Sequence, residues 1–234
     1  YYGKSWGHVV APTNRRPYGF NWEDWGRTDA LEVLDIVEEQ LNIDPDRVYL
    51  TGHSMGGHGT WHVGATFPDK FAAIGPSAGW ISFWSYLPGG EAQKVSKMDS
   101  MLLRAAQASN TFGLVENYKN FGVYILHGAD DKVVTAKQAH LMIEYLEKFH
   151  KDWDYHEEPG AGHWWDNSDE RGADCVDWAP LFDFYARHAR TQTRMKRHVE
   201  FITANPGISS TCYWLGVYSQ QNPLELSKTN VRFD

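Results

Sequence analysis

The sequence predicts an α/β domain built on a mostly parallel β-sheet with helices on both faces. Short apolar runs, typical of buried strands, alternate with amphipathic segments, typical of helices, along most of the 234 residues. One of these apolar runs leads directly into a Gly-x-Ser-x-Gly turn at Gly52 to Gly56. A chain of this length can bury a sizeable core in one domain without disulfides or metals.

The expected elements follow in chain order. We expect strands at 47–51, 71–76, 122–127 and 154–158, and helices at 29–41, 58–67, 135–150 and 180–190. Thr135 and Gln138 predict a capping box at the start of the third helix. The run from Val9 to Pro12 predicts the end of a further buried strand.

Three regions depart from this alternation. Between 81 and 120 the periodicity breaks up into short helical pieces around 91–98 and 100–108. We expect an insertion that shapes a substrate pocket or its lid, the alternative being a packing excursion without substrate contact.

Residues 198–234 predict a β-hairpin between 199–203 and 211–218, or the start of a β-rich module, after a catalytic domain at 1–197. The chain begins at Tyr1 without a lead-in strand, so we expect a fragment or processed chain that lacks its N-terminal strands.

Composition excludes several classes of partner. The net charge of −8 argues against nucleic acid and against an acidic membrane surface. Since no apolar run approaches 20 residues, no membrane span is predicted. Cys175 and Cys212 make neither a disulfide framework nor a metal-ligand spacing, which leaves the redox compartment open. His58 and His62 are four residues apart on a helix, but no third ligand accompanies them, and we predict neither a metal nor a cofactor.

The Gly-x-Ser-x-Gly turn has the form of a nucleophile elbow. Its strand-to-helix context predicts that Ser54 is a nucleophile lifted clear of the sheet. Gly52 and Gly56 flank the serine, and we expect that glycine is required at both positions because the strand and the helix pass too close there for a Cβ on either side. The N–H of Met55, at the helix N-terminus, would point to where a substrate oxyanion forms. The alternative is an ordinary glycine-rich turn with a capping serine.

A serine nucleophile needs a base, and the base needs an anchor. Both should follow later strands, because the carboxyl ends of parallel strands meet at one edge of a sheet. Asp130 and Asp131 follow the strand at 122–127, and we favour Asp131 because it stands directly before the Lys-Val-Val that leads into the next helix. The alternative is that both aspartates only cap the turn. His163, in a glycine-rich loop after the strand at 154–158, is the expected base.

Taken together, these motifs resemble the α/β-hydrolase superfamily. The resemblance is carried by Gly52-His53-Ser54-Met55-Gly56-Gly57, His127-Gly128-x-x-Asp131-x-Val133-Val134 and Gly160-x-Gly162-His163-x-Trp165. Within the superfamily they look most like the prolyl-oligopeptidase-like and polyhydroxybutyrate-depolymerase or feruloyl-esterase-like branch. The resemblance implies a Ser54-His163-Asp131 triad with Met55 as one oxyanion donor. It also implies a second oxyanion donor from an upstream loop that would precede Tyr1.

The leading functional hypothesis is a serine hydrolase that cleaves small-molecule or polymer-linked carboxylic esters through an acyl-enzyme. Four tryptophans near the predicted strand ends could line an aromatic or carbohydrate-linked acyl site: Trp80, Trp84, Trp164 and Trp165. The alternatives are a serine peptidase of the prolyl-oligopeptidase type and a non-catalytic binding domain with a hydrolase fold. The compartment is not determined, although exported relatives of this branch favour a secreted or periplasmic location.

Overall fold

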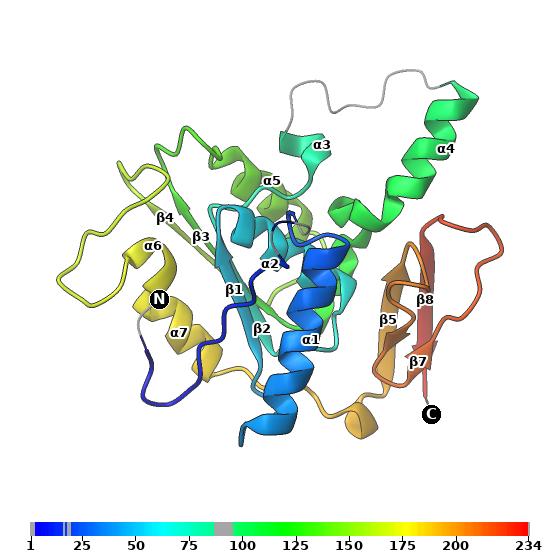
Figure 1. The fold of residues 1–234 in the computed structure, drawn as a ribbon, viewed down its shortest axis with the longest axis horizontal. Helices are drawn as coiled ribbons and strands as arrows, with labels where there is room; N and C mark the ends of the chain where they lie inside the picture. The colour runs from blue at the N-terminus through cyan, green and yellow to red at the C-terminus, as the bar shows by residue number, and fades with distance from the viewer. Residues whose placement is uncertain (1–2, 16, 18–19, 87–95, 234) are drawn as a thin grey trace.

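The computed structural model describes residues 3–15, 17, 20–86 and 96–233. Its central element is a four-stranded sheet in which all neighbouring strands run parallel (Figure 1). The strands lie in chain order and are β1 (Tyr49–His53), β2 (Ala73–Ser77), β3 (Gly122–Gly128) and β4 (Trp153–Glu158). The predicted parallel sheet is confirmed, and all four strands end at the same edge.

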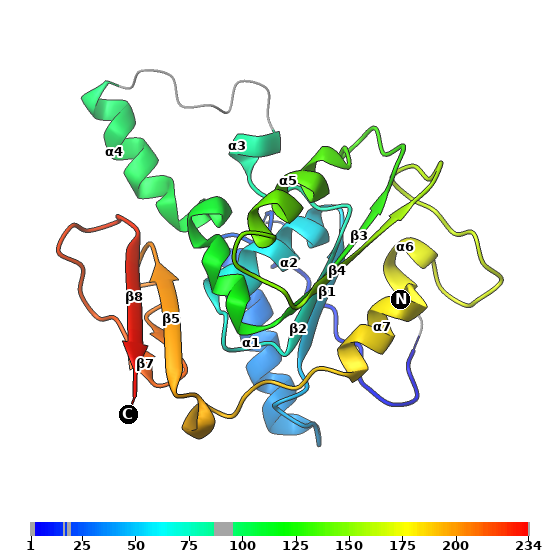
Figure 2. The same cartoon turned by 180° about the vertical axis from the view of Figure 1, so that it is seen from behind.

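Helices cover both faces of this sheet, as predicted. Figures 1 and 2 show α2 (Met55–Thr66) and α5 (Lys137–Leu146) on one side and α6 (Asp174–Asp177) and α7 (Ala179–Ala186) on the other. The remaining helical elements are α1 (Trp25–Gln40), α3 (Phe83–Tyr86), α4 (Lys97–Ala105), and the 3₁₀ segments η1 (Ala106–Ser109), η2 (Thr111–Asn120) and η3 (Thr193–Met195). None of the helices in the described ranges is both long and apolar enough to cross a membrane.

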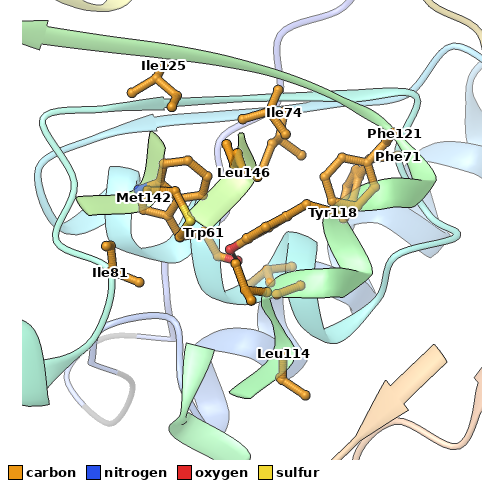
Figure 3. Packing of buried hydrophobic residues seen from close by; sticks show 14 of the residues in the cluster. Trp61, Phe71, Ile74, Ile81, Leu114, Tyr118, Phe121, Ile125, Met142 and Leu146 are labelled. Carbon is orange, nitrogen blue, oxygen red and sulfur yellow. Dashed lines mark hydrogen bonds between the residues drawn. The ribbon is translucent and has the colours of Figure 1, made fainter. Parts of the chain in front are cut away.

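The larger core lies between the sheet and the α2, α5 and η2 layer. Figure 3 shows its packing around the rings of Trp61 and Tyr118, which are almost completely buried. Ile74 and Ile125 reach this cluster from the sheet, and Met142 reaches it from α5. A smaller cluster on the opposite face packs α7 against β2 and β3. The sheet is therefore fixed from both sides.

The strand expected at Val9 to Pro12 is wrong. The structure assigns no strand to these residues, and the side chains of Val9 and Val10 are 48% and 45% exposed. A strand needs a partner for its backbone groups. Within the described ranges β1 is hydrogen-bonded to β2 alone, so this apolar run does not join the sheet.

The side chain of Gln138 in α5, which bonds residues at the start of the expected insertion, explains a second difference. Its carbonyl oxygen accepts hydrogen bonds from the Ile81 N–H (3.1 Å) and the Ser85 hydroxyl (2.8 Å), and its amide donates to the Ser85 carbonyl (2.9 Å). Because Gln138 is turned inward, the predicted capping box with Thr135 does not form, and α5 begins at Lys137 without a side-chain cap. A capping box forms instead at Ser96 and Asp99 at the start of α4. The expected helical piece at 91–98 falls partly outside the described residues.

A C-terminal antiparallel pair exists, but its strands differ from those predicted. β5 (His198–Thr203) pairs with β8 (Ser227–Arg232), whereas β6 (Thr211–Cys212) and β7 (Leu215–Gly216) form a separate small pair. The 211–218 segment turns back on itself at Tyr213, where φ is +54°, and cannot form one long strand. The Asn117 side chain in η2 attaches β5 to α2, because it bonds both backbone groups of Ile202 and the carbonyl of Ala65.

Candidate active site

Ser54 lies in a sharp turn between the last residue of β1 and the first residue of α2. Its φ is +58° and its ψ is −116°, a backbone conformation that non-glycine residues rarely adopt. Part of the glycine requirement is as expected, since a Cβ on Gly52 would lie 2.4 Å from the Gly56 carbonyl oxygen. The expectation for Gly56 itself is wrong, because a Cβ there would meet nothing within 4 Å. The crowded helical position is Gly57, whose Cβ would lie 2.3 Å from the Ser77 carbonyl oxygen.

The structure brings Ser54, His163 and Asp131 into one continuous line of contacts. The Ser54 Oγ lies 2.8 Å from the His163 Nε2, and the His163 Nδ1 lies 2.7 Å from the Asp131 Oδ2. An ionised carboxylate can only accept, so the His163 Nδ1–H donates to Asp131. The Nε2 atom then carries the lone pair and can accept the Ser54 proton. This is the geometry that general-base activation of a serine requires.

Asp131 makes both kinds of contact that the sequence offered as alternatives, one with the turn and one with His163. Its Oδ1 accepts the backbone N–H groups of Val133 (2.8 Å) and Val134 (2.9 Å), which caps the turn, while Oδ2 faces His163. Asp131 is 4% exposed, whereas Asp130 is exposed to solvent. His127 adds support, since its Nε2 lies 2.7 Å from the Val134 carbonyl and 3.5 Å from Asp131. The sequence does not reveal this contact.

The loop of Asp131 packs closely against the loop of His163. A Cβ on Gly128 would lie 2.3 Å from the carbonyl oxygen of Gly162 and 2.6 Å from that of Ala161. The Asp130 N–H also donates to the Ala161 carbonyl at 2.8 Å. This backbone contact fixes the distance between the two loops.

His53, the last residue of β1, lies directly beside the candidate site. Its Nδ1 lies 3.0 Å from the Ser77 Oγ, and Ser77 donates its single hydroxyl proton to the Cys175 carbonyl at 2.5 Å. His53 must therefore donate through Nδ1–H, which leaves Nε2 as a buried acceptor without a partner among the described residues. Burial lowers the pKa of His53 to about 4, and the neighbouring His163 adds to this shift. The ring is thus neutral near pH 7.

The four predicted substrate tryptophans have different surroundings. Trp80 is buried, and its ring stacks against those of His58 (5.0 Å between centroids) and Tyr86 (4.9 Å between centroids). Trp165 packs in a buried cluster on the α6 side of the sheet. Trp164 is 65% exposed, and its ring lies 4.0 Å from the ring of His53. Trp84 lies in α3, and its side chain is outside the described part of the structure.

The two helical histidines considered as metal ligands face other groups. The His58 Nε2 lies 3.3 Å from a carboxylate oxygen of Glu23, and the His62 Nε2 lies 3.0 Å from the Arg27 guanidinium. Burial lowers the pKa of His62 to about 3. In the described ranges, no three His, Cys, Asp or Glu side chains gather in a way that could hold a metal ion.

Comparison with known proteins identifies the family. The profile of the prolyl oligopeptidase family matches residues 14–192, about three quarters of the chain. The chain belongs to this family. The matched region of the chain includes Ser54, Asp131 and His163, in that order.

Individual relatives include enzymes that act on esters. The chain is 32% identical over 168 residues to an uncharacterised secreted protein of Arthroderma benhamiae, covering 67% of this chain and 18% of that protein. It is 26% identical over 133 residues to a bifunctional acetylxylan esterase/xylanase of Neocallimastix patriciarum, covering 55% of this chain and 16% of that protein. The chain thus spans less than a fifth of the length of either relative.

A solved thermostable esterase has the same fold. The two structures share 20% sequence identity with a TM-score of 0.50, over 71% of this chain and 38% of the other. At this identity the likeness shows the α/β-hydrolase fold and nothing finer. Family and relatives together support a serine hydrolase.

We expect Gly57→Ala to lower the free energy of unfolding by about 1–3 kcal/mol, because its Cβ would overlap backbone atoms that cannot move aside. Gly56→Ala is the matched control on the next residue, and we expect no loss, since Ala stabilises a helix by about 1 kcal/mol relative to Gly. Urea unfolding of both variants measures the difference. Equal losses in the two variants would contradict the crowding at Gly57.

The lowered pKa of His53 predicts a specific pH dependence. As pH falls below the ordinary value of 6.5, the unfolded chain takes up this proton before the folded protein does. The contribution of His53 to stability is therefore complete above pH 6.5 and is lost between there and about pH 4. NMR titration of the histidine ring protons should give a midpoint near 4 for the signal that disappears in His53→Asn. A midpoint near 6.5 would refute the neutral buried ring.

Proposed function

We propose that the protein hydrolyses carboxylic esters through a covalent acyl-enzyme. The carrying observation is the line of contacts from the Ser54 Oγ through His163 to the Asp131 carboxylate, at 2.8 and 2.7 Å. Distances of this size let a base take the serine proton while the carboxylate holds the required tautomer. In this proposal Ser54 is the nucleophile, His163 the general base and then acid, and Asp131 the orienting carboxylate.

The reaction would proceed in two halves. The Ser54 oxygen attacks the ester carbonyl carbon while its proton passes to the His163 Nε2. The alcohol leaves as its C–O bond breaks, and it takes the proton from His163. Water then attacks the acyl carbon, giving its proton to His163, and the Ser54–acyl bond breaks as His163 returns that proton to Ser54. The Met55 N–H at the start of α2 is the proposed donor to the oxyanion in both halves.

Two observations support esters, and carbohydrate-linked esters in particular. One relative in the comparison is named as an acetylxylan esterase/xylanase. An exposed aromatic ring, Trp164, directly follows the proposed base. Since Trp80 and Trp165 are buried, we propose a substrate contact for Trp164 alone among the described members of the predicted set.

The family match favours a second candidate, a serine peptidase of the prolyl-oligopeptidase type. Both activities would use the same three side chains. They differ in the leaving group, an alcohol in an ester and an amine in a peptide. Hydrolysis of 4-nitrophenyl acetate compared with that of a prolyl-4-nitroanilide separates the two.

The proposed nucleophile is tested by intact-mass spectrometry with a fluorophosphonate probe. We expect one covalent adduct on the wild type and none on Ser54→Ala, because only an activated serine reacts with this probe. Absence of an adduct on the folded wild type would contradict the proposal and favour a binding domain.

The choice of acid gives a further prediction. Asp131→Asn should lower kcat for 4-nitrophenyl acetate by about 10³- to 10⁴-fold, because an amide at this position favours the wrong tautomer of His163. Asp130→Asn is the matched control and should retain activity within about two-fold, since the Asp130 side chain faces solvent. Steady-state kinetics of both variants decide the matter, and a comparable loss in Asp130→Asn would remove Asp131 from its proposed role.

A further inference from the structure

We infer that Trp164 is the binding platform for the alcohol portion of the ester, and that this portion is a sugar ring. The inference rests on the proposed esterase function and assigns the side of the site that each half of the substrate occupies.

The stereochemistry places the leaving alcohol beside His163. When the acyl carbon loses the alcohol, the leaving oxygen must take its proton from the His163 Nε2, so it lies within hydrogen-bonding distance of that atom. In the proposed mechanism the carbonyl oxygen points toward the N–H of Met55, the first residue of α2. The alcohol group therefore extends past the imidazole of His163, in the direction of the loop that carries it.

Trp164 is the residue that follows His163 in this loop. Its ring centroid lies 6.2 Å from that of His163, and the two rings are almost perpendicular at 84°. This separation lies within the 4.5–7 Å range of ring contacts. A group bonded to the leaving oxygen would thus reach the indole of Trp164 within the length of one ring.

The ring of His53 supports the indole of Trp164 on one side. The ring of His53 lies 4.0 Å from the ring of Trp164 at a 45° tilt, and His53 is itself fixed by Ser77. Ser77 is anchored in turn on the Cys175 carbonyl. A large apolar side chain that is supported on one side yet 65% exposed presents a preformed surface for stacking.

The surroundings of the exposed ring favour a sugar over an alkyl or aryl alcohol. Trp164 and Asp166 are both exposed, whereas Trp165 between them is buried, so the loop offers solvent an indole and, two residues later, a carboxylate. A pyranose has apolar C–H faces that stack on an aromatic ring and hydroxyls that remain solvated or donate to carboxylates. An exposed indole in a loop that also carries an exposed carboxylate matches both properties.

The test compares two acetate esters that form the same acyl-enzyme. The substrates are an acetylated methyl xyloside and ethyl acetate, for which kcat/KM reports acylation and therefore includes the leaving group. We expect Trp164→Ala to lower kcat/KM for the sugar ester by about 3- to 10-fold relative to ethyl acetate, the size of one lost ring contact. Trp164→Tyr, which retains a flat ring, should recover most of the loss.

Deacylation provides the internal control. The alcohol has left by that stage, so the rate after the burst with 4-nitrophenyl acetate should be the same in the wild type and Trp164→Ala. Trp214→Ala removes a partly exposed tryptophan from the C-terminal β6–β7 pair and should change neither quantity.

Each other outcome overturns a defined claim. If the burst is intact and the ratio of the two kcat/KM values is unchanged in Trp164→Ala, the alcohol platform is wrong and the esterase proposal stands. If Trp164→Ala alters deacylation or the preference for acetyl over butyryl esters, Trp164 faces the acyl group instead. If the wild type shows no burst and no turnover of any ester, the proposed function fails, and the platform fails with it.

Discussion

The buried carboxylate of Asp131 is the constraint on which the site depends. A charged group that is only 4% exposed is costly unless hydrogen-bond donors surround it. Its own loop supplies two donors, the N–H groups of Val133 and Val134, and a third comes from His163 in the loop after the next strand. Compensation of this one charge therefore draws two loops together. It also fixes the orientation of the imidazole that faces Ser54.

Each strand of the sheet contributes one part of this arrangement at its carboxyl end. Ser54 follows β1, Ser77 ends β2, Asp131 follows β3 and His163 follows β4. Because the strands are parallel and lie in chain order, their carboxyl ends share one edge of the sheet. Each of these residues reaches that edge because it lies at, or a few residues after, the end of its strand. β2 contributes through Ser77, whose hydroxyl contacts His53 and whose carbonyl oxygen accepts the backbone N–H of Ser54 at 2.9 Å. The site is thus a property of the whole sheet edge.

The sequence predicted the parts of the site that local patterns encode. Ser54 stands in a short turn motif, and Asp131 and His163 follow predicted strands whose ends must meet in a parallel sheet. All three residues could therefore be predicted from local motifs and the topology of the sheet. The strand that pairs with β5 could not be predicted, because the β8 sequence Ser-Lys-Thr-Asn-Val-Arg contains almost no apolar residues. Gln138 was misassigned for a related reason: its role depends on Ile81, 57 residues away, and local spacing indicated a cap instead. Contacts of this kind arise only from tertiary packing.

The imidazole of His53 contacts that of the proposed base, His163, and this contact is compatible with base catalysis only if His53 stays neutral. While His163 carries the serine proton, a positive charge on His53, with ring centroids 4.8 Å apart, would oppose it by Coulomb repulsion. Burial prevents this by lowering the pKa of His53 to about 4, and the bond to Ser77 fixes its proton on Nδ1. The neutral ring can then pack against both His163 and Trp164. The proposed base and the proposed alcohol platform therefore share one rigid support, and their relative orientation is set before any substrate binds.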